Sequence, residues 1–129
     1  MAEKKHILIV DDDPDFSEAT KIVLQRTYQV TLASDGDECL NIVAKQKPDL
    51  ILLDVMMTKF GEGFDVCRTI KRNPETASVP IIMFTAVEKK LGFNFKSNLG
   101  DDQWLPADDY LDKPVDPSTL LEKVARILK

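Results

Sequence analysis

Short apolar runs alternate along the chain with longer segments in which apolar residues recur every three or four positions. The runs predict β-strands, and unbroken runs such as 7–10 and 50–53 are typical of strands buried on both faces of a parallel sheet. The segments between them predict helices with one apolar face. The expected strands cover residues 7–10, 29–33, 49–54, 80–85 and 108–112, with 29–33 polar enough for a sheet edge.

Local signals indicate where the helices begin and end. Asp13-Pro14 and Asp116-Pro117 each predict an N-cap aspartate followed by proline in the first turn. A second helix is expected to begin at Ser34-Asp35-Gly36. The pattern predicts four helices outside residues 87–106. The residues predicted to face the core are Phe16, Ala19, Ile22 and Val23; Cys39, Leu40 and Val43; Phe64, Cys67 and Ile70; and Leu120, Leu121, Val124, Ile127 and Leu128.

The alternation of strands and helices predicts the fold class. It indicates an α/β protein with a flavodoxin-like, doubly wound, five-stranded parallel sheet of strand order 2-1-3-4-5. The chain shows no internal repeat, low-complexity segment or linker, so we expect a single domain over residues 1–129. Residues 87–106 follow neither pattern, which predicts an extended, atypical segment between the fourth and fifth strands.

Composition and charge exclude several classes of function. The chain has 129 residues, with 17 Lys+Arg against 22 Asp+Glu and a net charge of −5. Neither nucleic acid nor an anionic membrane is therefore an expected partner. No apolar run is long enough to span a bilayer and no signal-peptide pattern is present, so we expect a cytoplasmic protein. Cys39 and Cys67 are expected to be buried thiols, and His6, beside a lysine pair, is expected to be solvated.

Polar residues follow the predicted strands where they end. Asp11 and Asp12 come after the first strand and Asp54 ends the third, so three carboxylates converge if these strands are neighbours. Oxygen ligands of this kind suit Mg²⁺. Thr85 and Lys113 end the fourth and fifth strands and would suit phosphoryl oxygens, with Asp54 as the nucleophile. Each residue alone could be a cap, a turn residue or a strand hydroxyl, so the prediction depends on their convergence.

Four segments together resemble the receiver domain of two-component response regulators. They read ILIVDDDP at 7–14, LLDVMM at 52–57, FTA at 84–86 and DDYLDKP at 108–114. The resemblance implies a phosphorylation-controlled signalling domain in which Asp54 accepts a phosphoryl group from a sensor histidine kinase or a histidine phosphotransfer protein. The resemblance implies a regulatory domain and not an enzyme, since such a domain has no separate substrate and catalyses only its own phosphorylation and dephosphorylation. It would dock to a downstream protein partner or relay the phosphoryl group, as a monomer or a phosphorylation-dependent dimer.

The resemblance also implies roles for individual residues. Asp11 would act on the metal ion through water, and the other ligands would bind it directly. The site residues implied are Asp11, Asp12, Asp54 and the backbone carbonyl of Met56 for Mg²⁺, Thr85 and Lys113 for the phosphoryl oxygens, and Thr85 with Tyr110 as the switch pair.

Two loops depart from the family pattern. Thr58 stands where proline is usual, and the loop 59–63 looks one residue longer. The 28 positions from Thr85 to Lys113 exceed the usual span, so the fourth helix is expected to be shortened, displaced or partly unfolded. The aromatic residues around 92–106 would either pack back on the domain or form a partner-binding patch.

Other functions fit parts of the pattern. The main alternative, a Mg²⁺-dependent phosphatase with an aspartyl nucleophile, needs a second Asp two residues after Asp54, where this chain has Met56. A flavin-binding domain of the same fold needs a phosphate loop, and no glycine-rich phosphate motif is present. A pseudo-receiver is disfavoured because the site residues are retained.

Overall fold

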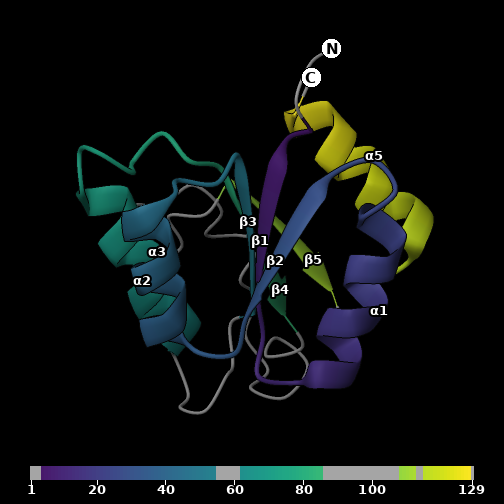
Figure 1. Cartoon of the computed structure of the whole chain (residues 1–129), viewed down its shortest axis with the longest axis horizontal. Helices are drawn as coiled ribbons and strands as arrows, with labels where there is room; N and C mark the ends of the chain where they lie inside the picture. Colours follow the sequence, from purple (N-terminus) through teal and green to yellow (C-terminus); the bar gives the residue numbers. More distant parts are fainter. Residues whose placement is uncertain (1–3, 55–61, 86–107, 113–114, 129) are drawn as a thin grey trace.

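The described part of the chain forms a parallel sheet in the order β2-β1-β3-β4-β5 (Figure 1), as predicted. The computed structural model describes residues 4–54, 62–85, 108–112 and 115–128. The strands are β1 (His6–Val10), β2 (Gln29–Ala33), β3 (Leu50–Asp54), β4 (Ile81–Thr85) and β5 (Asp109–Asp112). The helices are α1 (Pro14–Leu24), α2 (Gly36–Lys45), α3 (Glu62–Arg72) and α5 (Pro117–Ile127).

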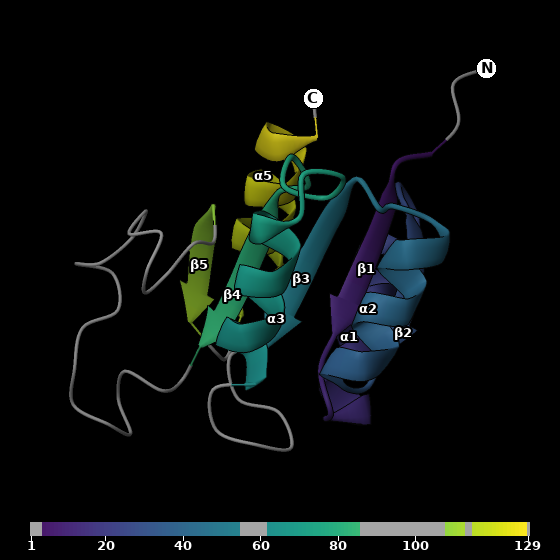
Figure 2. The ribbon, with the colours of Figure 1, turned by 90° about the vertical axis from the view of Figure 1, so that its left-hand side faces the viewer.

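Helices cover both faces of the sheet. Figures 1 and 2 show α2 and α3 on one face and α1 and α5 on the other. Because successive side chains of a strand point to opposite faces, each strand contributes to two hydrophobic clusters. Leu8 and Val10 of β1 lie in the cluster with α2 and α3, and Ile7 and Ile9 lie in the cluster with α1 and α5. This arrangement explains the unbroken apolar runs.

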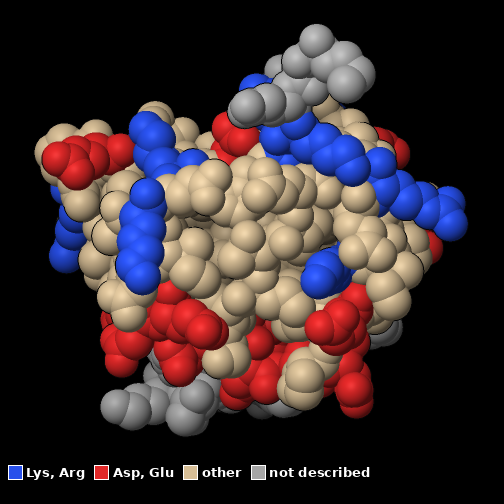
Figure 3. All heavy atoms as spheres, viewed as in Figure 1, with Lys and Arg blue, Asp and Glu red and all other residues tan. Residues whose placement is uncertain are grey.

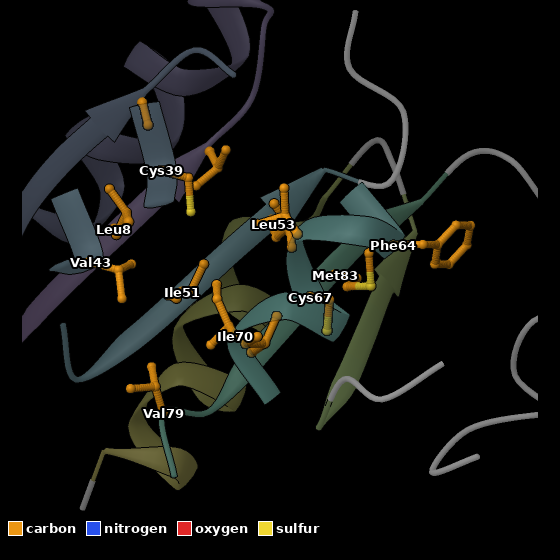
Figure 4. Packing of buried hydrophobic residues seen from close by; sticks show 14 of the residues in the cluster. Leu8, Cys39, Val43, Ile51, Leu53, Phe64, Cys67, Ile70, Val79 and Met83 are labelled. Carbon is orange, nitrogen blue, oxygen red and sulfur yellow. The ribbon is translucent and has the colours of Figure 1, made fainter. Parts of the chain in front are cut away.

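The cluster beneath α2 and α3 contains both cysteines (Figure 4). Cys39 and Cys67 are free thiols with no exposed surface, which confirms the prediction of two buried thiols. Burial raises the pKa of each thiol to about 12. Both groups therefore behave as small apolar side chains in the folded protein.

Aspartate caps begin three helices, and two of these caps, Asp13 and Asp116, are predicted from the sequence. The Asp13 carboxylate accepts from the Asp15 N–H at 3.0 Å and begins α1. Asp35 and Asp116 cap α2 and α5 in the same way. Hydrogen bonds from the Thr119 backbone N–H and from the Ser118 side chain lower the pKa of Asp116. These carboxylates satisfy N–H groups that have no partner inside the helix.

The prediction of which α1 residues face the core is partly wrong. Ile22 is 61% exposed and Ala19 is also exposed. The Thr20 hydroxyl donates to the Phe16 carbonyl at 2.8 Å, so this polar side chain is satisfied inside its own helix and can face the sheet. On α5, Leu121 is likewise 38% exposed. The buried residues of α1 are Ser17, Thr20 and Leu24.

The expectation that His6 is solvated is wrong. His6 is the first residue of β1 and is only 5% exposed. Its ring Nε2 is hydrogen-bonded to Thr31 Oγ1 at 2.8 Å, and its backbone N–H donates to Asp49 Oδ2 at 2.7 Å. Burial lowers the pKa of His6, while Asp49 acts in the opposite direction.

Two predictions about loops and connections fall outside the described residues. They are the extended segment 87–106 with its shortened fourth helix, and most of the longer loop at 59–63. Among the helices that the structure does describe, none is both long and apolar enough to cross a membrane.

Candidate functional site

Asp11 is held where the chain leaves β1. Its backbone N–H donates to the Ala33 carbonyl at 3.0 Å, which extends the pairing with β2 by one residue. Its Oδ1 accepts from the Asp13 N–H at 2.9 Å, and the side chain is 2% exposed. Asp12 is exposed, and Asp13 is already used as the cap of α1. The three adjacent aspartates therefore have three different environments.

Asp54 reaches the same place because of strand register. Val10 of β1 lies opposite Leu53 of β3, so the next residues along the two strands, Asp11 and Asp54, are also neighbours. Asp54 lies opposite Phe84 of β4 and is 6% exposed. The central position of β3 thus places one nearly buried carboxylate beside the end of β1.

The carboxylates of Asp11, Asp12 and Asp54 form a compact cluster. One oxygen from each can be chosen so that all three lie within 4.8 Å of one another. Figure 3 shows that acidic side chains gather along the lower edge of the molecule, where the strands end. Three oxygen ligands, one of them exposed, fit a hard divalent cation that keeps several waters, such as Mg²⁺. The predicted convergence of these acids is confirmed.

The end of β4 is anchored against α1. Phe84 packs edge-on against Phe16, with ring centroids 5.1 Å apart and an interplanar angle of 78°. Thr85 follows as the last residue of β4 and lies opposite Asp112 of β5. Its backbone therefore stands at the same edge of the sheet as Asp54.

Tyr110 lies on β5 opposite Met83 and is 5% exposed. It belongs to the cluster beneath α2 and α3, and burial raises the pKa of its phenol. Within the described ranges its hydroxyl oxygen has no hydrogen-bond partner. The two remaining predicted residues, Met56 and Lys113, lie outside the described residues, so their roles stay predictions.

A second group of charged residues, at the opposite edge of the sheet, was missed by the sequence analysis. The Lys71 ammonium donates to Val79 O at 2.7 Å and to Asp108 Oδ2 at 2.9 Å. Asp108 Oδ2 also accepts from the Ile81 N–H at 2.8 Å, at the start of β4. An aspartate just before a strand, as at 49 and 108, is the signal that could have revealed this structural group.

Residues 7–125 match the family model described as response regulator receiver domain. The chain therefore belongs to this family, and the phosphatase alternative is not favoured. It is 38% identical over 128 residues to the DNA-binding dual master transcriptional regulator RpaA of Synechocystis, covering 95% of this chain and 48% of that protein. It is 32% identical over 123 residues to protein PilH of Pseudomonas aeruginosa, covering 95% of this chain and 96% of that protein.

The relatives differ in length. The chain spans about half the length of RpaA and of several other curated relatives it matches, whereas it matches PilH over nearly its whole length.

Solved structures share the fold over nearly the whole chain. The chemotaxis response regulator CheY4 of Vibrio cholerae has a TM-score of 0.79 at 28% identity, covering 96% of this chain and 98% of that one. A CheY-like response regulator receiver domain protein from Methanospirillum hungatei JF-1 has a TM-score of 0.77 at 30% identity, covering 98% and 94%. The flavodoxin-like fold class is confirmed.

Proposed function

We propose that this chain is a signalling domain controlled by phosphorylation of Asp54. The observation that carries the proposal is the cluster of three carboxylates at the carboxyl edge of a receiver-family sheet. Asp54 ends a central strand and is nearly buried, whereas Asp12 is exposed and Asp11 accepts the Asp13 N–H. Asp54 is therefore the nucleophile, and the other two acids serve the metal ion.

The transfer is a displacement at phosphorus. A carboxylate oxygen of Asp54 attacks the phosphorus atom of a phosphohistidine, a P–O bond forms, the P–N bond breaks and the imidazole departs. Asp11, Asp12, Asp54 and the backbone carbonyl of Met56 would hold Mg²⁺. The ion would offset the negative charge of these carboxylates and of the phosphoryl oxygens.

Thr85 and Lys113 complete the proposed site. The Thr85 hydroxyl and the Lys113 ammonium would contact the phosphoryl oxygens of modified Asp54. Thr85 and Tyr110 would then act as the switch pair, because a change at the end of β4 reaches the neighbouring strand β5. The side-chain conformation of buried Tyr110 would report such a change.

The proposed output is protein docking or relay of the phosphoryl group. Residues 1–129 would act as one receiver domain in the cytoplasm, as a monomer or a phosphorylation-dependent dimer. The phosphodonor would be a sensor histidine kinase or a histidine phosphotransfer protein.

Labelling of the intact protein tests the proposal. Incubation with Mg²⁺ and acetyl phosphate should add one phosphoryl group, detected by mass spectrometry and mapped to Asp54. Asp54→Asn should abolish the adduct, and chelation of Mg²⁺ should suppress it. Asp65→Asn changes an exposed aspartate of α3 and is the matched control, which should label like the wild type. Failure of the folded wild type to label would overturn the proposed function.

A further inference from the structure

The two edge strands of the described sheet differ in composition. β2 has the sequence QVTLA, with no charged residue and no proline. β5, at the other edge, carries Asp109 and Asp112, and Asp109 pairs with Lys123 at 2.8 Å. Charged residues and prolines at a sheet edge hinder pairing with a further strand. Of these two strands, β5 has this protection and β2 does not.

The backbone of β2 turns polar groups toward its outer side. The Gln29 N–H donates to the carbonyl just before β1, and the Ala33 carbonyl accepts from the N–H just after β1. Successive residues of a parallel strand turn their backbone groups alternately to one side and the other. Val30 and Leu32 therefore direct their N–H and C=O groups away from β1, where no described strand lies.

The surface around β2 has opposite charges at its two ends. Lys4 is exposed and lines a hollow beside Gln29, the first residue of the strand. Glu18 and Glu38 are exposed and line a hollow beside Leu32, near its end. Figure 1 has β2 on the side nearest the viewer, and Figure 3 shows that side as an uncharged surface with mostly basic side chains above it and acidic side chains below it.

We propose that β2 pairs antiparallel with β2 of a second copy of this chain, around a two-fold axis beside Thr31. In this register Val30 of each copy lies opposite Leu32 of the other, and the outward N–H and C=O groups of these residues are exchanged as hydrogen bonds. The two sheets then continue into one another.

Charge selects the antiparallel orientation. The positive start of each β2 lies beside the negative end of the other, so opposite charges meet at both ends of the contact. In a parallel pair the like charges would meet and repel. A second copy fits this edge because a two-fold contact uses the same surface on both partners.

The contact is short and lies away from Asp54. Because a single strand buries little surface, we expect weak self-association, with a dissociation constant of roughly 0.1 mM. It requires no phosphoryl group, and it is separate from any dimer that phosphorylation produces.

Amide hydrogen exchange of the unphosphorylated full chain tests the contact residue by residue. The N–H groups of Val30 and Leu32 should exchange at least threefold more slowly at about 1 mM protein than at about 10 µM, because most of the chain is dimeric only at the higher concentration. The Thr31 N–H points toward β1 and is the internal control, with protection that does not depend on concentration. Analytical ultracentrifugation gives the dissociation constant.

A proline substitution removes the outward donor. Val30→Pro deletes an N–H that does not bond to β1, and proline is tolerated on an edge strand where its nitrogen faces solvent. Self-association should weaken roughly tenfold or more, because the donor is lost and the ring obstructs the second strand. Val30→Thr keeps the N–H and the branched side chain, and this matched control should associate like the wild type.

Charge reversal tests the orientation without changing the strand. Lys4→Glu and Glu18→Lys each place like charges together at both ends of the contact and should weaken self-association roughly threefold. A mixture of the two variants should recover the wild-type affinity, because opposite charges then meet again in the mixed dimer. Asp65→Lys reverses a charge on α3, which Figure 2 shows over a different part of the sheet, and should have no effect.

Several outcomes would overturn the proposal. These are a chain that stays monomeric at about 1 mM, a folded Val30→Pro variant that still associates, or mixed charge variants that do not recover affinity. Protection of Val30 and Leu32 that is independent of protein concentration would indicate a partner strand within the same chain. If Val30→Pro does not fold, the charge variants decide. None of these measurements needs a phosphodonor, so their failure and the failure of Asp54 labelling are separate results.

Discussion

Aspartates occupy both edges of the same parallel sheet, in different surroundings. At the amino edge, Asp49 and Asp108 accept the backbone N–H groups of His6 and Ile81, the first residues of two strands. At the carboxyl edge, the oxygens of Asp11, Asp12 and Asp54 lie within 4.8 Å of one another.

The direction of the strands explains the difference. The start of a parallel strand leaves N–H donors that a carboxylate can accept, whereas its end leaves carbonyl oxygens, which cannot pair with a carboxylate. The same residue type is therefore structural at one edge and suited to binding a cation at the other. Three substitutions and a change of pH test this comparison.

Lys71→Met should be the most damaging change at the amino edge. The substitution removes an ammonium that donates to Val79, Ala77 and Asp108, and should lower the free energy of unfolding by about 2 kcal/mol. Urea denaturation measures the loss. Arg72→Met changes the next residue, which is exposed, and should cost less than about 0.5 kcal/mol. Equal losses in both variants would contradict a specific role for Lys71.

Asp12→Ala should affect metal binding and not folding. Removing one exposed carboxylate of the cluster should weaken Mg²⁺ binding at least tenfold, which is about 1.4 kcal/mol. The free energy of unfolding without metal should stay the same or rise, because repulsion among the acids decreases. Calorimetric titration with Mg²⁺ measures the first effect. Asp15→Ala, in the adjacent turn, is the control, and unchanged affinity in Asp12→Ala would remove Asp12 from the site.

Asp13→Ala should affect folding and not metal binding, which is the reverse of the expectation for Asp12→Ala. Loss of the N-cap of α1 should lower the free energy of unfolding by about 1 kcal/mol. Asp13→Asn keeps the capping oxygen and should recover most of this stability. Thermal unfolding of both variants provides the measurement. A loss of Mg²⁺ affinity as large as that of Asp12→Ala would show that the two aspartates are not separate in function.

A pH change should give the smallest effect, at the amino edge. Burial lowers the pKa of His6 from the ordinary value of 6.5, so below this pH the unfolded chain binds a proton that the folded chain does not. Stability should therefore fall as the pH drops through 6.5 toward the lower folded pKa. The urea midpoint should change less between about pH 7.5 and about pH 5.5 in His6→Gln than in the wild type. Both proteins share the contribution of the carboxylates to this change, but only the wild type has that of His6. Identical differences in both proteins would show that His6 contributes nothing.

The sheet and the convergence of the three acids could be predicted because they depend on simple patterns. The run 7–10 is apolar at every position, which indicates burial on both faces, and each acid directly follows such a run. Strand order then brings the ends of β1 and β3 together. No side-chain detail was needed for Asp11 and Asp54 to be placed correctly.

The burial of Thr20 and His6 could not be predicted from hydrophobic patterns. Thr20 is buried because its hydroxyl reaches a carbonyl of its own helix, and Ile22 is exposed although it is more apolar. His6 is buried where its ring is hydrogen-bonded to Thr31 and its backbone N–H donates to Asp49. Both partners come from segments distant in sequence, so the local pattern around His6 does not reveal them. The roles proposed for the Met56 backbone carbonyl and the Lys113 side chain rest on the family resemblance alone.

The position of the two cysteines gives the protein a built-in reporter of local opening. Cys39 and Cys67 both lie in the cluster beneath α2 and α3, while the cluster beneath α1 and α5 contains neither. With pKa values of about 12 and no exposed surface, their thiols can react with an alkylating reagent only after that layer opens. The rate of alkylation therefore measures how often one half of the molecule opens, independently of the other half.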